Sequence, residues 1–255
     1  MMFREEISWY STRLEHHMSI RIYGEKGTPV LVFPTQDAMS DNFENFGMID
    51  TLSGYIESGK IQLFCVDTVD AATWSNVWGD KGWRAGRQES YYNYVVEEVL
   101  PFIAERNGTG ILPIVTGCSL GGFHAAILFL RRPELFSGIL SLSGVYDAKF
   151  FFDGWLDGTL YENSPVDFLP NMQSDHPYIQ QYSEKPLILC VGQGAWEDEG
   201  RRTTAIMRDI FQAKGIRAWV DFWGHDVNHD WYWWKEQILY YLPYLLGEKE
   251  LEANC

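Results

Sequence analysis

The chain has 255 residues, and its 35 acidic and 20 basic side chains give a formal net charge of −15 at pH 7. Such a charge repels polyanions at long range, so the composition argues against nucleic-acid binding and against a strongly acidic substrate. At this length one α/β domain can bury roughly 70–75% of the surface that its unfolded chain exposes, and we expect a single domain over 1–255.

The N-terminal residues, 1–7, have no positively charged segment leading into an apolar core, so they do not look like a secretory signal. The chain also has no apolar run of about 18 residues that could span a membrane. Metal-ligand spacing is absent among its four cysteines, and the expected chemistry needs no organic cofactor. These features predict a reduced, cytoplasmic protein. The cysteines are Cys65, Cys118, Cys190 and Cys255.

Short apolar runs alternate with segments of helical periodicity along the chain, without repeats or low-complexity tracts. This order is typical of a mostly parallel sheet covered by helices on both faces. Helical core faces are predicted at 94–103 and 206–211, and the second of these helices is expected to end at Gly215. The predicted strands are 20–23, 30–33, 61–66, 112–116, 139–143, 187–191 and 218–223.

The segment 117–122 reads Gly-Cys-Ser-Leu-Gly-Gly and lies between a predicted strand and an apolar helix at 123–130. A sharp strand-to-helix turn needs small neighbours around a strained central residue whose side chain projects over the sheet edge. The glycines stand at those places, so the pattern predicts that Ser119 is a nucleophile. Cys118 comes one residue earlier, where strand alternation points its thiol away from that side.

Later segments supply partners in the order serine, acid, histidine, which is the chain order of α/β-hydrolases. A serine attacks a carbonyl when a base takes its proton, and a carboxylate must hold that base in one tautomer. The loop after strand 187–191 has three consecutive acids, and the loop after strand 218–223 has two histidines. These candidates are Glu197, Asp198, Glu199, His225 and His229.

The chain resembles, over nearly its whole length, the putative esterase family of the α/β-hydrolases. This family includes feruloyl esterases, esterase D-like enzymes and mycolyl-transferring antigens. The resemblance rests on the elbow at Ser119, on the sequences Glu-Val-Leu-Pro-Phe at 98–102 and Arg-Pro-Glu-Leu-Phe at 132–136, and on His-Asp-Trp at 229–231 with Trp234. It implies an α/β-hydrolase fold and either ester hydrolysis or acyl transfer.

The resemblance also implies roles for individual residues. The family's catalytic histidine is followed by an acidic residue and an aromatic one, which favours His229 as the base and leaves His225 as a pocket or supporting residue. Spacing in similar esterases favours Asp198 as the acid. The mycolyl-transferring relatives use a glutamate in this loop, which keeps Glu197 as the alternative.

An oxyanion hole is expected to combine the backbone N–H of Leu120 with one from the loop after strand 30–33. By position, Gln36 is the second donor. Many relatives have His-Gly where this chain has Pro34-Thr35, which is a departure from the family pattern within this loop.

Two aromatic-rich insertions, at about 73–92 and 146–182, are expected to form a lid and a pocket, because loops at the carboxyl ends of parallel strands surround the site in open α/β sheets. They provide Trp74 and Trp155 as candidate pocket residues, together with His225. The same aromatic side chains could equally form a small lid core or the contact surface of a homo-oligomer.

The sequence therefore favours a serine carboxylic-ester hydrolase that acts on a small-molecule ester through an acyl-enzyme. An acyltransferase with the same residues is the first alternative, in which an alcohol replaces water. A non-catalytic binding protein on the same fold is the least favoured hypothesis, because a decayed site usually loses at least one of its serine, histidine and carboxylate, although fold alone never establishes activity.

Overall fold

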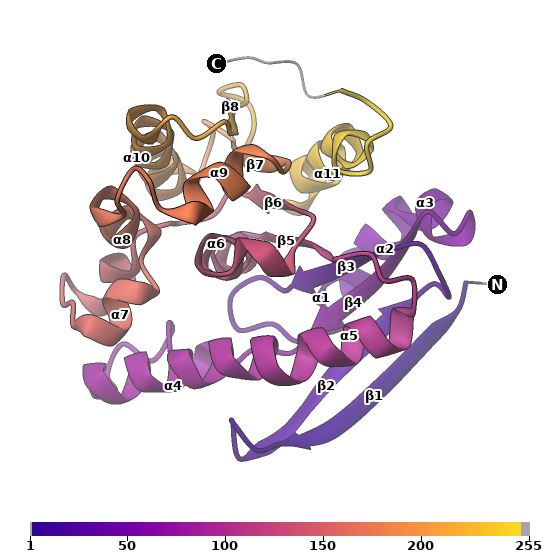
Figure 1. The fold of residues 1–255 in the computed structure, drawn as a ribbon. Coiled ribbons are helices and arrows are strands. Elements are labelled where there is room, and N and C mark those ends of the chain that lie inside the picture. The colour runs from indigo at the N-terminus through magenta and orange to yellow at the C-terminus, as the bar shows by residue number, and fades with distance from the viewer. Residues whose placement is uncertain (1, 251–255) are drawn as a thin grey trace.

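The computed structural model describes residues 2–250, and within them one eight-stranded sheet carries the fold (Figure 1). The strand order is β1-β2-β4-β3-β5-β6-β7-β8. β2 pairs antiparallel with β1 and β4, whereas all pairs from β4 to β8 are parallel. The strands are β1 (Arg4–Ser11), β2 (His16–Tyr23), β3 (Thr28–Phe33), β4 (Ile61–Val66), β5 (Ile114–Cys118), β6 (Gly138–Leu142), β7 (Leu187–Val191) and β8 (Trp219–Phe222).

The central strands of the sheet, β3 to β7, are buried on both faces, as their apolar sequences require. Alternate residues of β3 show this, because Leu31 and Phe33 belong to one hydrophobic cluster and Val30 and Val32 to the other. The first cluster is covered by α4 (Lys81–Tyr94), α5 (Leu100–Asn107), α6 (Leu120–Arg131), α7 (Gly158–Glu162), α8 (Pro165–Asn171), α9 (Pro177–Ser183) and α10 (Asp198–Lys214). The second is covered by α1 (Asn42–Asn45), α2 (Met48–Thr51), α3 (Ser53–Glu57) and α11 (Trp231–Leu245).

All seven predicted strands are present, and the predicted α/β-hydrolase fold with helices on both faces is confirmed. The helix end at Gly215 is also confirmed, because α10 stops at Lys214 and Gly215 adopts a left-handed φ of 65°. The sequence did not reveal β1. Its residues alternate between exposed and half-buried along a sheet edge, so β1 has no apolar run and is recognised only by its pairing with β2.

A long helical segment covers one face of the sheet and changes its winding midway. α4 and α5 continue one another in Figure 1, and the π-helical turn η2 (Val95–Val99) joins them. Pro101 follows this turn and has no N–H to donate to the preceding turn, which is a common reason for a break in regular α-helical bonding. The core face predicted at 94–103 spans the π-helical turn.

The two segments predicted as lid insertions pack against each other and against the sheet. Most of 73–92 is helix α4, whose Tyr91 is fully buried, so this part is a covering helix of the sheet. The 146–182 segment contains η4 (Ala148–Phe152), α7, α8 and most of α9. The buried Arg84 joins the two segments by donating to the carbonyl oxygens of Thr73 (2.7 Å) and Phe151 (2.8 Å).

Two short elements remain, η1 (Asp70–Ala72) and η3 (Pro133–Leu135), which are 3₁₀ turns like η4. Between residues 2 and 250 no helix is long and apolar enough to cross a membrane. Cys65, Cys118 and Cys190 are buried free thiols, whereas Cys255 lies outside the described residues.

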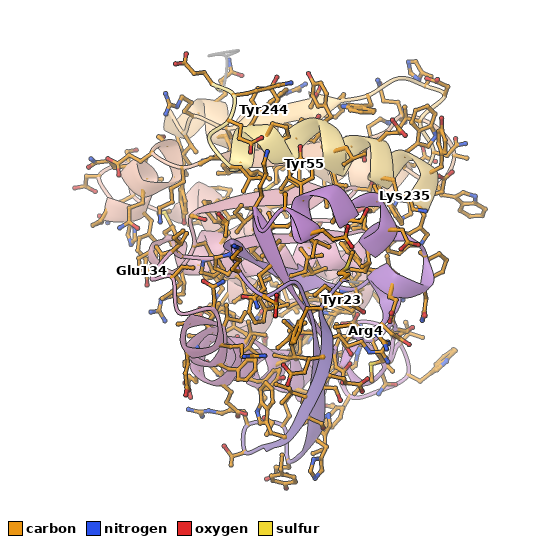
Figure 2. The ribbon with its side chains drawn as sticks, turned by 90° about the vertical axis from the view of Figure 1, so that its right-hand side faces the viewer. Arg4, Tyr23, Tyr55, Glu134, Lys235 and Tyr244 are labelled. Atoms are coloured by element: carbon orange, nitrogen blue, oxygen red, sulfur yellow. The ribbon has the colours of Figure 1, made fainter. Side chains whose placement is uncertain are left out.

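The carboxylate of Glu44 fastens the N-terminal hairpin to helix α1. Its Oε2 atom accepts hydrogen bonds from Arg4 (2.8 Å), Arg21 (2.8 Å) and Tyr23 (3.1 Å). Figure 2 shows Arg4 and Tyr23 close together on the hairpin. Partial burial alone would raise the pKa of Glu44. The hydrogen bonds from Arg4 and Tyr23 have a larger combined effect than burial and lower the pKa from its ordinary value of 4.5.

We expect Glu44→Gln to destabilise the protein at neutral pH and to have little effect in acid. Because the pKa of Glu44 is lower in the folded state, its contribution is fully present above pH 4.5 and is lost as the pH falls through the folded-state value. Thermal unfolding at pH 7 should show a decrease in Tm of about 2–4 °C, and the difference should shrink below pH 4. A decrease of equal size at both ends of the pH range would contradict this role.

Candidate active site

Ser119 stands at a strained turn between β5 and α6, at the carboxyl edge of the sheet. Its φ is 58° and its ψ is −125°, which is unusual for a residue other than glycine. The turn is held by Ser119 N–H, which donates to Leu142 O (2.8 Å), and by Ser119 O, which accepts from Gly122 N–H (3.0 Å). The strand, the sharp turn and the helix predicted from the sequence are therefore present.

Two glycines allow three backbone segments to meet beside Ser119. A Cβ atom on Gly117 would lie 2.4 Å from the carbonyl carbon of Gly121. A Cβ atom on Gly121 would lie 2.5 Å from both Phe33 O and Pro34 O. Strand β5, helix α6 and the loop after β3 thus approach so closely that no side chain fits between them.

Gly121→Ala should consequently destabilise the protein, because backbone atoms cannot move aside as a flexible side chain could. We expect a loss of about 1–3 kcal/mol in the free energy of unfolding, measured by urea titration. Gly86→Ala is the matched control, since Gly86 lies inside helix α4 with nothing within 4 Å of an added Cβ. That control should gain about 0.5–1 kcal/mol. Equal effects of the two substitutions would contradict the close approach.

A continuous chain of hydrogen bonds joins Ser119, His229 and Glu197. His229 Nε2 lies 2.8 Å from Ser119 Oγ, and His229 Nδ1 lies 3.0 Å from Glu197 Oε2. The three side chains come from loops after β5, β8 and β7, which meet at one edge because these strands are parallel. The side chain of Glu197 is 1% exposed, whereas that of His229 is 22% exposed.

Hydrogen bonds join the loops after β7 and β8 beside the contact between Glu197 and His229. His229 N–H donates to Ala195 O (3.0 Å), and Ala195 N–H donates to Asn228 Oδ1 (2.8 Å). These bonds fix the backbone on both sides of the Glu197–His229 contact. With Nδ1–H directed at the carboxylate, Nε2 is left as the acceptor for the serine hydroxyl, and an imidazole in this tautomer can take the hydroxyl proton during attack on a carbonyl.

Among the three consecutive acids, the structure places Glu197 on the histidine and corrects the preference for Asp198. Asp198 is the first residue of α10, its side chain is 91% exposed, and it pairs with Arg201 at 3.2 Å. Glu199 points to Arg202 (2.6 Å). Successive residues at a helix start point in different directions, so only Glu197, the residue before the helix, reaches inward.

The second oxygen of Glu197 is also occupied. Oε1 accepts a hydrogen bond from Ser143 Oγ (2.6 Å) and one from Gly192 N–H (3.3 Å). Sequence reasoning did not single out Ser143. Its position at the end of the predicted strand 139–143 was the available signal, but its contact with Glu197 depends on a φ of 53° that the sequence does not reveal.

The loop after β3 supplies amides beside the elbow. Pro34 has no N–H, and that of Thr35 donates to Asn42 Oδ1 (2.9 Å), so Gln36 carries the first amide of this loop that could serve a ligand. Its side chain donates to Ser75 Oγ (2.7 Å). On the other side, Leu120 begins helix α6, where the first N–H groups have no acceptor one turn earlier.

The three candidate pocket residues have different surroundings. Trp74 is 1% exposed and packs against Phe123, with ring centroids 5.0 Å apart, so the expectation that it lines a pocket is corrected to a place in the core. Trp155 is half-buried and stacks on Phe152, with centroids 5.9 Å apart. His225 is exposed.

A further aromatic residue near the site, not predicted from the sequence, is Trp196, which precedes Glu197, has a φ of 67° and is 88% exposed. An exposed indole beside the acid loop is a better candidate for contact with a ligand than Trp74. Its position after a strand and before the acids was visible in the sequence, but its exposure was not.

Two other side chains near the elbow that could act as a nucleophile or bind a metal, Cys118 and His124, are buried in the core. Burial raises the pKa of the Cys118 thiol well above its ordinary value, so the thiol is protonated at neutral pH. His124 is fully buried on α6, and its Nε2 lies 2.8 Å from Asp70 Oδ1. Over residues 2–250, no three or more His, Cys, Asp or Glu side chains are grouped to hold a metal ion.

The sheet order, the covering helices and the elbow between β5 and α6 define an α/β-hydrolase. Similar solved structures include a ferulic acid esterase, with 14% identity, 96% of this chain and 98% of that chain covered, and a TM-score of 0.75. An S-formylglutathione hydrolase from Agrobacterium tumefaciens has 16% identity, coverage of 96% and 95%, and a TM-score of 0.74. MPT51 of Mycobacterium tuberculosis has 14% identity, coverage of 96% and 98%, and a TM-score of 0.71.

The sequence pattern of the family described as "Putative esterase" matches residues 11–245. The chain therefore belongs to this esterase family and is a carboxylic ester hydrolase, as the sequence analysis predicted. No curated protein matches the chain.

Proposed function

We propose that the protein hydrolyses a small-molecule carboxylic ester through a covalent acyl-enzyme on Ser119. The observation that carries this proposal is the unbroken chain from Ser119 Oγ through His229 to Glu197 (2.8 and 3.0 Å). The positions of the three residues on neighbouring loops of the esterase fold support it further.

In the first half of the reaction, Ser119 Oγ attacks the ester carbonyl carbon while His229 Nε2 takes the hydroxyl proton. The tetrahedral intermediate has a negatively charged oxygen, which the backbone N–H groups of Leu120 and Gln36 would stabilise as the oxyanion hole. Glu197 holds the protonated imidazole in place and offsets its charge. When the intermediate collapses, His229 gives its proton to the departing alcohol, and the acyl group stays on Ser119.

In the second half, water takes the place of the alcohol. His229 Nε2 removes a proton from the water as the oxygen attacks the acyl carbonyl, and a second tetrahedral intermediate forms. Its collapse returns the proton to Ser119 Oγ and releases the carboxylic acid. The same steps with an alcohol in place of water give acyl transfer, so an added alcohol that accumulated as a new ester would favour the acyltransferase alternative.

The substrate, the cellular location and the oligomeric state stay predictions. Ferulic acid esterase and S-formylglutathione hydrolase are among the similar structures, so aryl-acyl esters and acyl thioesters are the first compounds to screen. The three buried thiols are compatible with the predicted reduced, cytoplasmic environment. Sedimentation velocity would test whether a homo-oligomer forms.

Intact-mass spectrometry after reaction with a fluorophosphonate probe tests the proposal without knowledge of the substrate. We expect one adduct on the native protein, located on Ser119 by peptide mapping, and strongly slowed labelling of His229→Ala. Both proteins should give the same circular dichroism spectrum. Absence of any adduct on folded native protein would contradict the proposal and favour the non-catalytic binding hypothesis.

A further inference from the structure

Behind Glu197 lies a second set of hydrogen bonds that the proposed reaction does not use directly. Trp234 Nε1–H, on helix α11, donates to Ser143 Oγ (3.0 Å), and the Ser143 hydroxyl donates its proton to Glu197 Oε1 (2.6 Å). Ser143, Glu197 and Trp234 are all buried. Each polar hydrogen in this set has one acceptor, so the contacts are compatible with one another.

The same indole also touches the other end of the acid–base pair. The rings of Trp234 and His229 meet edge to face, with centroids 4.9 Å apart and an angle of 83° between their planes. Glu197, His229, Trp234 and Ser143 therefore form a closed ring of contacts.

Ser143 has a strained backbone conformation, which indicates that its side chain contributes to the site. Its φ of 53° lies in the left-handed region that favours glycine, and the strand residue before it, Leu142, accepts the N–H of Ser119. Glycine would adopt this conformation with less strain, but it has no hydroxyl to donate to the Glu197 carboxylate. Ser143 N–H donates to Cys190 O (2.7 Å), which fixes the residue between β6 and β7.

The hydrogen bonds to Glu197 Oε1 prevent rotation of the Glu197 carboxylate. The terminal torsion of a glutamate is broad, so an unrestrained carboxylate would sample orientations in which neither oxygen faces the histidine. Ser143 and Gly192 N–H hold Oε1, and Oε2 is thereby directed at His229 Nδ1. A misplacement of about 1 Å in such a site can cost about 100-fold in rate.

We propose that Ser143 and Trp234 are positioning residues, which act through Glu197 to keep His229 oriented towards Ser119. This inference rests on the proposed function, because it assigns a role relative to the Ser119–His229–Glu197 chain. It adds two residues to the requirements of the reaction, one directly after β6 and one on α11, and gives a reason for the strained backbone of Ser143.

The protein contains a matched control at a distance from the site. Near the tip of the N-terminal hairpin, Ser11 Oγ donates to Glu98 Oε1 (2.9 Å) and Trp9 Nε1–H donates to Glu98 Oε2 (2.9 Å). Ser11 is fully buried, as Ser143 is. Ser11→Ala therefore removes a similar serine–glutamate bond without touching the candidate active site.

The experiment measures kcat and KM for p-nitrophenyl acetate and the rate of fluorophosphonate labelling in variants of the whole chain. We expect Ser143→Ala to lower kcat by about 10- to 100-fold, with KM nearly unchanged, and Trp234→Phe, which keeps a ring on His229, to lower it by about 2- to 10-fold. Ser11→Ala should leave both constants unchanged. Ser143→Gly serves as a second variant, because it removes the hydroxyl and tolerates the φ of 53°.

A double-substitution cycle separates positioning from a general structural effect. In a Glu197→Gln background the carboxylate is gone, so adding Ser143→Ala should lower kcat by less than about twofold. An equal loss in both backgrounds, or an unchanged kcat in Ser143→Ala and Ser143→Gly, would overturn the inference. Unchanged turnover and labelling in Glu197→Gln would also overturn the inference. The proposed function fails on a different result, the absence of any fluorophosphonate adduct on the folded native protein, so the two failures are distinguished.

Discussion

Ser119→Ala is expected to lower kcat for ester hydrolysis by about 10⁶-fold, because the side chain proposed to form the covalent intermediate is removed. The oxyanion donors and the binding surface would remain, so a residual rate above that of the uncatalysed reaction should persist. Burst-phase kinetics on p-nitrophenyl acetate would check the result, since the initial release of nitrophenol that signals acyl-enzyme formation should disappear.

The Tm of the Ser119→Ala variant must also be measured, to show that a loss of activity does not come from unfolding. Alanine keeps the Cβ at the strained φ of 58°, so we expect a Tm close to that of the native protein. Ser90→Ala is a suitable control, because this serine lies on helix α4 and its hydroxyl only donates to Gly86 O (3.0 Å). Full activity in folded Ser119→Ala protein would eliminate the assigned mechanism.

Glu197→Gln is expected to lower kcat by about 10⁴-fold with little change in KM. An amide can present its N–H to His229 Nδ1 and thereby stabilise the tautomer in which Nε2 carries the proton and cannot accept one from Ser119. The buried position of Glu197 makes water an inadequate substitute for the lost carboxylate. Steady-state kinetics across a range of substrate concentrations would separate the effect on kcat from that on KM.

The neighbouring acid provides the sharpest comparison. Asp198→Asn changes the same functional group one residue later, but its side chain points into solvent and pairs with Arg201. We expect kcat within about twofold of the native value, because an exposed ion pair contributes little. A large loss in Asp198→Asn together with normal activity in Glu197→Gln would reverse the assignment of the acid.

Features that depend on local chemistry and on the order of segments could be predicted from the amino-acid sequence. Apolar runs predicted seven of the eight strands, the glycines of 117–122 predicted the turn at Ser119, and Gly215 predicted a helix end. The order serine, acid, histidine placed the candidates after parallel strands whose carboxyl ends lie along one edge of the sheet. The strand, turn and helix-end signals are readable because each depends on neighbours within a few residues, and the order of the candidates is read directly along the chain.

Which side chains contact one another follows from the three-dimensional packing and not from the sequence pattern. Glu197, Asp198 and Glu199 are alike in composition, and the start of α10 turns the first inward while it leaves the second exposed. Trp74 enters the core rather than a pocket, and Ser143, which follows β6 and lies 54 residues earlier in the sequence, reaches Glu197. Direction at a helix start, burial and long-range hydrogen bonds depend on packing between distant segments, and for that reason local sequence patterns do not contain them.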